Sequence, residues 1–127
     1  MNPGDTFLDF DPTYGAHLWV VVATPGTQAL TFNFTTLRPG PRCDTSCIIR
    51  AGEHPFVTRD TVVEYRRGFV AEQVHWEKVV AAGGARSHVG VSAAVLLRIQ
   101  QGALASKFTE QAHQRIIRQL LGIPEPR

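Results

Sequence analysis

The hydrophobic positions in the first two-thirds of the chain follow the spacing of β-strands. Residues 18–23 (LWVVVA) are a continuous apolar run rich in β-branched side chains, which is typical of a strand buried on both faces. Residues 29–35 instead alternate apolar and polar side chains, as in a strand with one face toward a core. Further strands are predicted at residues 6–10 and 61–70, and segments with Pro or Gly separate the strands as turns or loops.

The last third of the chain has the period of helices. Ser92 is a suitable N-cap for one predicted helix and Thr109 for a second, which Gly122 and Pro124 end. Each predicted helix has one apolar stripe, formed by Val95, Leu96, Ile99 and Ala103 in the first and by Ala112, Ile116, Ile117 and Leu120 in the second.

Two short segments between the strands predict a hairpin. Residues 46–49 and 55–57 have the composition of its arms, around a turn at residues 50–53. Together these patterns predict an α+β fold in a single domain, residues 1–127. Residues 1–80 are expected to form a small, strongly curved β-sheet or barrel, and residues 90–122 two C-terminal helices, with Gly83-Gly84 as a joint between the two parts.

Composition limits the function classes only loosely. The chain of 127 residues is 43% hydrophobic and 19% charged, as expected of a globular protein large enough to bury its own core. Its net charge of +2 is mildly basic, which permits a nucleic-acid partner without requiring one.

Neither a membrane segment nor a secretory signal is predicted. No apolar run approaches the roughly 18 residues that a membrane helix needs. The first residues, MNPGDTF, have neither the positive start nor the apolar centre of a signal peptide. We therefore expect a cytoplasmic protein, in which a disulfide between Cys43 and Cys47 would not persist, so the two cysteines are thiols or metal ligands.

Residues 4–15 (GDTFLDFDPTYG) resemble the start of the MazF/PemK toxin family. In that family a Gly-Asp step enters the first strand, and a similar segment leads into a loop before a valine-rich strand, here residues 19–22 (WVVV). The next strand ends in Phe34-Thr35-Thr36, similar to the Thr-Thr or Thr-Ser step of the family. The resemblance covers residues 4–36, whereas residues 60–70 and the helical tail match only in kind.

The resemblance implies an SH3-like β-barrel with C-terminal helices, which forms a homodimer and binds a small antitoxin protein. It also implies a metal-independent endoribonuclease that cleaves single-stranded RNA, with a catalytic arginine before the valine-rich strand and a catalytic threonine after the next one. The threonine corresponds to Thr35 or Thr36. The place of the arginine is taken by His17-Leu18, and this departure leaves the activity open.

The chemistry of RNA cleavage fits these residue types. A base must take the proton of the 2′-hydroxyl, an acid must protonate the leaving oxygen, and donors must hold the phosphate. Histidine is the residue type that can exchange a proton near neutral pH, so His17 suits the role of base or acid, while Thr35 or Thr36 supplies a hydrogen bond. The alternatives are a loop histidine without a catalytic role and two ordinary strand threonines.

Three arginines are candidate RNA-binding residues. Arg38 lies in the loop RPGPR that follows the predicted strand, and Arg66 and Arg67 lie within the strand at residues 61–70. Neighbouring residues of a strand point to opposite faces, so at most one of Arg66 and Arg67 is expected to face any single groove.

The segment from Cys43 to Phe56 (CDTSCIIRAGEHPF) leaves three alternatives. If the predicted hairpin forms, Cys47 and His54 become diagonal neighbours roughly 7 Å apart, with room for a metal ion between them. A zinc site would use Cys43, Cys47 and His54, although this spacing is a less specific signal than paired Cys-x2-Cys motifs. The second alternative is a Cys47–His54 nucleophile pair, and the third, which we favour, is Cys47 as a small buried side chain.

Three function classes remain open. The first is a toxin-like endoribonuclease that needs no cofactor. The second is a non-catalytic barrel module that binds a protein or RNA, and the third is a zinc-stabilised domain. Trp19 and Trp76 are expected in the core or a dimer interface rather than as platforms for RNA bases, and His75 and His113 in structural or exposed positions.

Overall fold

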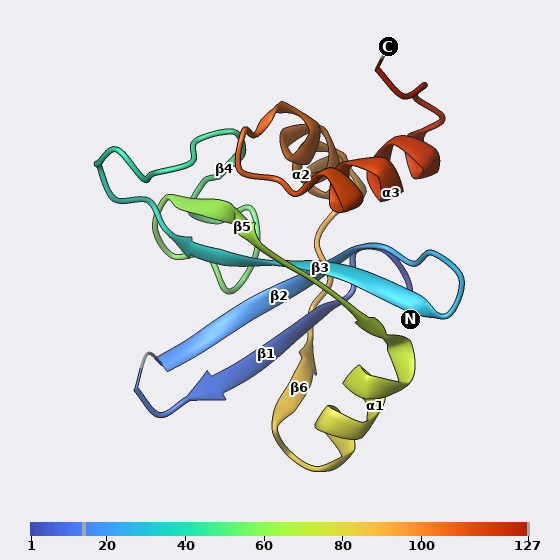
Figure 1. Ribbon diagram of the computed structural model, residues 1–127. Coiled ribbons are helices and arrows are strands. Elements are labelled where there is room, and N and C mark those ends of the chain that lie inside the picture. Colours follow the sequence, from blue (N-terminus) through green and yellow to red (C-terminus); the bar gives the residue numbers. More distant parts are fainter. Residues whose placement is uncertain (14, 127) are drawn as a thin grey trace.

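The computed structural model describes residues 1–13 and 15–126 and shows an α+β fold. Within these residues, six strands form one antiparallel sheet in the order β4-β5-β3-β2-β1-β6. The sheet twists strongly, with α2 and α3 on one side and α1 beneath the other (Figure 1). The elements are β1 Thr6–Asp11, β2 Gly15–Ala23, β3 Gln28–Thr36, β4 Ile48–Ile49, β5 Thr61–Glu72, α1 Gln73–Ala81, β6 Ala85–His88, α2 Ala93–Ala105 and α3 Gln111–Leu121.

Strand β2 is buried on both faces, as its continuous apolar run predicts. Leu18, Val20 and Val22 point toward α2 and α3, where they join the larger core with Phe32 and Ile99. Val21 points to the opposite side of the sheet. There it forms a second cluster with Phe7 of β1, Ala29 of β3 and Trp76 of α1. We call these the α2–α3 face and the α1 face of the sheet.

The two C-terminal helices form as predicted, but one cap and part of one apolar stripe differ. In α3, Ala112 and Leu120 of the predicted stripe are exposed, whereas Ile117 and His113 are buried. The Ser92 hydroxyl accepts a hydrogen bond from the Val95 N–H at 3.1 Å, and Gly122 ends α3 in the left-handed conformation. The prediction for Thr109 is wrong, because the N-cap of α3 is Glu110, which makes no side-chain capping bond. The Thr109 hydroxyl is buried and has no partner within the described residues.

Helix α1 and strand β6 were not predicted. Helix α1 buries only Trp76 and has no acidic residue in its first turn, and its N-cap residue, Glu72, makes no side-chain capping bond. Strand β6 has four residues and pairs with β1. The expected joint at Gly83-Gly84 is therefore the turn between α1 and β6, where Gly83 adopts a positive φ of 80°.

The predicted hairpin at residues 46–57 is wrong. Ile48 and Ile49 pair with Val62 and Thr61 of β5, not with residues 55–57. Residues 50–57 turn back on themselves, with the Gly52 N–H donating to the Val57 carbonyl at 3.0 Å. The short apolar segment has the longer strand β5 as a neighbour, and pairing with it satisfies the backbone of both.

No helix of the described chain has the length and apolar character that crossing a membrane requires.

Candidate functional site

Four of the residues predicted for the site, His17, Thr35, Thr36 and Arg38, line one hollow at the ends of β2 and β3. His17 lies within β2, not in the preceding loop as predicted, and is half-buried on the α1 face opposite Asp9 of β1. Thr35 and Thr36 are the last residues of β3. The pairing of Trp19 with Asn33 places His17 level with Thr35 on the neighbouring strand. The hollow, about 450 Å³, is the His17 cleft, lined by Ala16, His17, Phe34, Thr35, Thr36, Arg38, Phe56, Thr58, Arg59 and Thr61.

The His17 cleft is suited to an anion. Arg38 and Arg59 contribute two guanidinium groups, and none of the side chains that the structure describes in its lining is a carboxylate. Both arginines are exposed, and neither has an ion-pair partner within residues 1–13 and 15–126. Unpaired guanidinium groups present rigid donors that match the oxygens of a phosphate.

The hydroxyl groups of the cleft differ in how they are used. Thr61 donates to the Arg59 carbonyl at 2.9 Å and so helps to fix the backbone that carries Arg59. Thr35 and Thr36 are half-buried and belong to strand β3, which holds their positions through its pairing with β5. Because neighbouring residues of a strand point to opposite faces, Thr35 shares the α1 face with His17 and Thr36 does not.

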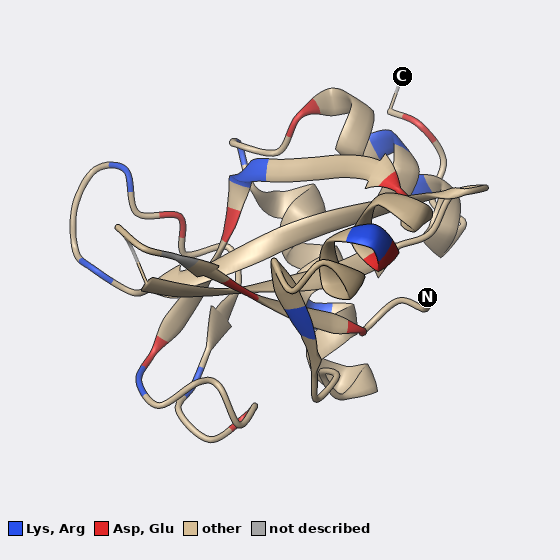
Figure 2. Ribbon diagram, turned by 90° about the horizontal axis from the view of Figure 1, so that it is seen from below, with Lys and Arg blue, Asp and Glu red and all other residues tan. Residues whose placement is uncertain are grey.

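A second hollow of about 390 Å³ continues from the first across Thr35, Thr36 and Arg38, which line both. The loop between β3 and β4 forms its far wall and adds Arg42, and Figure 2 shows basic residues in blue along this loop. Arg66 lies with its guanidinium carbon 4.2 Å from the centre of the Phe108 ring, and both line this hollow. Asp44 and Glu64 also line it, so its charge is mixed, unlike that of the His17 cleft.

Arg67 lies apart from both hollows. It is exposed and reaches back to Glu64, with 3.7 Å between its Nε and the carboxylate. Only Arg66 of the pair faces the groove, which agrees with the alternation of side chains along a strand.

The structure gives Cys43, Cys47 and His54 separate environments. His54 is buried at 3% exposure, and its Nε2 lies 2.6 Å from the Val89 carbonyl oxygen, which can only accept. Nε2 therefore carries the proton, and Nδ1 accepts from the Phe56 N–H at 3.1 Å. With both ring nitrogens engaged, His54 has no free lone pair for a metal. Across the part of the chain that the structure describes, no group of three or more His, Cys, Asp or Glu residues is arranged to hold a metal ion.

Cys47 is a buried core residue. It packs beside Tyr65 and Gly102, and burial raises the pKa of its thiol, with opposing contributions from the Tyr65 hydroxyl and from Arg98. Burial likewise raises the pKa of the Tyr65 hydroxyl, which donates to the Ile99 carbonyl at 2.7 Å. A thiol with a raised pKa stays protonated at neutral pH, so Cys47 is a poor nucleophile.

Comparison of the chain with protein-family models, with curated proteins and with solved structures gives no match.

Sequence reasoning missed Arg59 and Phe108. Arg59 lies in an irregular segment before β5, and Phe108 lies between α2 and α3. Neither belongs to a helix or strand whose apolar period would predict where its side chain points. The sequence feature that could have indicated Arg59 is its position two residues before Thr61, the first residue of the strand predicted at 61–70.

Proposed function

We propose that the protein binds single-stranded RNA in the His17 cleft and cleaves it as a metal-independent endoribonuclease of the MazF/PemK type. The observation that supports this proposal is the convergence of His17, Thr35 and Thr36 with two unpaired arginines in one hollow without a carboxylate. The arginine that the resemblance implies before the valine-rich strand is absent, and Arg38 or Arg59 supplies its charge from the opposite wall.

In the proposed reaction the imidazole of His17 takes the proton of a ribose 2′-hydroxyl. The 2′-oxygen then forms a bond to the neighbouring phosphorus, and the bond from that phosphorus to the 5′-oxygen breaks. The leaving oxygen takes a proton from water. The products are a 2′,3′-cyclic phosphate and a 5′-hydroxyl. The reaction that forms them needs neither a metal nor a redox partner.

The arginines stabilise the charge that develops on the phosphate. Arg38 and Arg59 donate to its non-bridging oxygens, and the hydroxyl of Thr35, on the same face as His17, adds a neutral donor from the end of β3. The second hollow then receives the neighbouring nucleotide, where Arg66 and Phe108 offer a flat cationic and aromatic surface to a base.

The wider biological setting belongs to the same proposal. By resemblance, the protein acts as the toxin of a toxin–antitoxin pair, forms a homodimer and is neutralised by a small antitoxin protein. An RNA-cleaving toxin arrests growth when expressed alone, so growth arrest is a test in cells that accompanies the test in solution.

The test is incubation of the purified protein with a single-stranded RNA of mixed sequence, with and without a chelator. We expect cleavage in both conditions and products that end in a cyclic phosphate. His17→Ala should slow cleavage by about a hundredfold or more, because it removes the base. His75→Ala is the matched control, since it removes an exposed histidine that lies outside the cleft.

Other outcomes have definite meanings. RNA that stays intact with the wild-type protein contradicts the nuclease proposal. RNA that is bound but not cut favours the alternative of a non-catalytic binding module. Cleavage that the chelator abolishes contradicts the metal-independent mechanism. Cleavage that survives His17→Ala unchanged removes His17 from the chemistry.

A further inference from the structure

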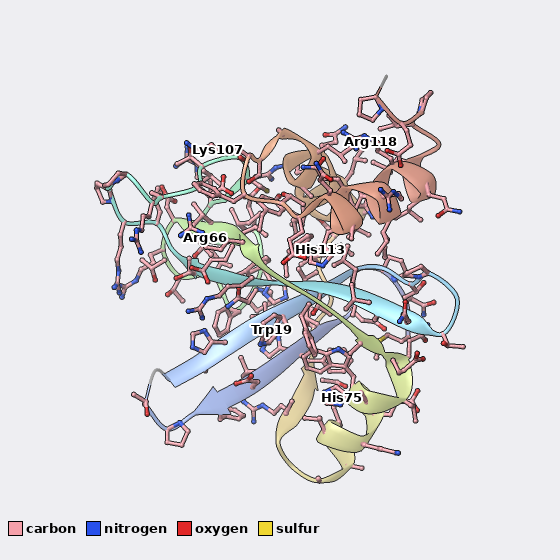
Figure 3. All side chains as sticks on the ribbon, in the orientation of Figure 1. Trp19, Arg66, His75, Lys107, His113 and Arg118 are labelled. Atoms are coloured by element: carbon pink, nitrogen blue, oxygen red, sulfur yellow. The ribbon has the colours of Figure 1, made fainter. Side chains whose placement is uncertain are left out.

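A separate hollow lies on the α1 face of the sheet, between β1, β2, β5 and α1. Its volume is about 310 Å³, at the lower end of the range for small-molecule sites. Figure 3 shows Trp19 on β2 and His75 at the start of α1. Five of its lining side chains are aromatic or acidic, and we call this set the aromatic hollow: Asp9, Trp19, Phe69, His75 and Trp76.

The rings of the aromatic hollow stand at steep angles to one another. Trp76 forms the base, 5% exposed and stacked on Phe7 at 5.1 Å on its other side. Phe69 meets it at 79° and His75 at 73°, while Trp19 is tilted by 51°, with ring centres 6.1 to 6.5 Å from that of Trp76. Walls at such angles enclose a round group from several sides, whereas a flat base needs parallel surfaces.

Asp9 gives the hollow its charge. One of its carboxylate oxygens accepts from the Trp19 indole N–H at 3.3 Å, which holds the two side chains together. Asp9 has no ion-pair partner among the described residues, and it is the only carboxylate that lines the hollow. Among the lining residues that the structure describes there is no lysine or arginine to neutralise it.

From this geometry we propose that the aromatic hollow binds a quaternary ammonium group. A methylated cation is attracted by the faces of Trp and Phe rings, and it gains further from an unpaired carboxylate at the rim. The same chemistry occurs in a free small molecule such as choline and in a trimethylated lysine of a protein. This activity is independent of the RNA cleft, because none of the five residues lines that cleft.

The chain offers a direct probe for the test. Its only two tryptophans, Trp19 and Trp76, both line the hollow, so both indole N–H signals of isotope-labelled protein report on it. Choline and a short peptide with trimethyllysine are added in separate titrations. We expect saturable shifts of the indole signals with at least one of them. The neutral isostere of choline, with carbon in place of nitrogen, should bind at least about fivefold more weakly.

Two variants assign the contacts. Phe69→Ala removes one wall and, since Phe69 is 41% exposed, should leave the fold intact while weakening binding about fivefold. Asp9→Asn keeps an oxygen that can accept from the Trp19 N–H but removes the charge. It should weaken binding of the cation and leave binding of the neutral isostere unchanged. Phe10→Ala is the matched control, because Phe10 is also exposed but lies outside the hollow.

The result identifies the source of the cation or overturns the proposal. Shifts with the peptide alone assign the hollow to a methylated protein, and shifts with choline assign it to a small molecule. Equal binding of choline and its isostere, or shifts only with nucleosides, overturns it. Absence of any shift at millimolar ligand also overturns it, whatever the RNA assay gives.

Discussion

The two faces of the sheet differ in composition, although the same strands supply both. The α2–α3 face buries apolar side chains around Tyr65, whose hydroxyl is bonded to the backbone of α2. The α1 face buries the polar side chains of Thr31 and Asn33 and carries His17 and Thr35 at its open end. The α2–α3 face supplies most of the packing, and the α1 face carries His17, Thr35 and the aromatic hollow.

Coverage by helices explains the difference. Two glycines let α2 and α3 approach the sheet closely. A side chain at Gly102 would strike Tyr65 and Cys47, and one at Gly68 would come within 2.5 Å of the His113 ring. Helix α1 covers the opposite face only around Trp76, so the far end of that face stays open to solvent. The comparison predicts that substitutions on the α2–α3 face change stability, whereas those on the open end change binding.

The largest effect is expected for Gly102→Val. The new side chain would meet the Tyr65 hydroxyl and the Ser46 carbonyl, and both are held by other bonds or by the backbone. Overpacking of this kind, together with the poor helix propensity of valine, should lower the free energy of unfolding by about 3 kcal/mol. Denaturant titration measures it. Gln101→Val, at the neighbouring exposed position of α2, should cost less than about 1 kcal/mol. Equal losses would show that α2 does not pack as described.

A smaller effect is expected for Tyr65→Phe. The substitution keeps the ring, which packs edge-on against Phe32 at 5.0 Å, and removes the hydroxyl that donates to Ile99 and contacts the Cys47 thiol. The free energy of unfolding should fall by about 1 kcal/mol. Thermal unfolding of the two proteins at equal concentration measures the change. Unchanged stability would mean that the hydroxyl contributes nothing to holding α2 on the sheet.

The same contrast explains how much the sequence could predict. Strands β1, β2, β3 and β5 have clear apolar periods, and the short turn between β2 and β3 brings His17 level with Thr35. That part of the cleft could be predicted because consecutive antiparallel strands are neighbours.

The path of residues 46–60 could not be predicted. Its direction depends on contacts with distant elements, namely the pairing of β4 with β5 and the bonds from Arg98 of α2 to Glu53. Arg59 reaches the cleft only along that path. Helix α1 could not be predicted either, because a single buried residue, Trp76, does not produce an apolar stripe with the period of a helix.

Protonation of Glu53 should have a modest, pH-dependent effect on this segment. Hydrogen bonds from Arg98 and from the Arg50 N–H lower the pKa of the Glu53 carboxyl in the folded protein. A lowered folded-state pKa contributes stability above the ordinary carboxyl range, and this contribution is lost as the pH falls through the folded pKa. Glu53→Gln should therefore reduce stability by at most about 1 kcal/mol near neutrality and converge with the wild type in acid.

The control for that measurement is Glu125→Gln. Glu125 is exposed and lies 3.8 Å from both Arg115 and Arg118, so its loss should leave the pH profile of unfolding unchanged. If Glu53→Gln shifts the curve equally at all pH values, the Arg98 pair is not the source of the pH dependence.

The smallest effect on stability is expected for Arg59→Ala at the open end of the α1 face. Arg59 is exposed and forms no ion pair within the described chain, so the free energy of unfolding should change by less than about 0.5 kcal/mol. RNA affinity should nevertheless fall. In a plot of the logarithm of the binding constant against the logarithm of salt concentration, the steepness of the slope should decrease by about 1, because one phosphate contact is lost. Binding of a single-stranded RNA at several salt concentrations measures both, with Arg115→Ala on α3 as the control. If Arg59→Ala destabilises the fold, or if both variants bind alike, the open end of this face is not set apart for binding.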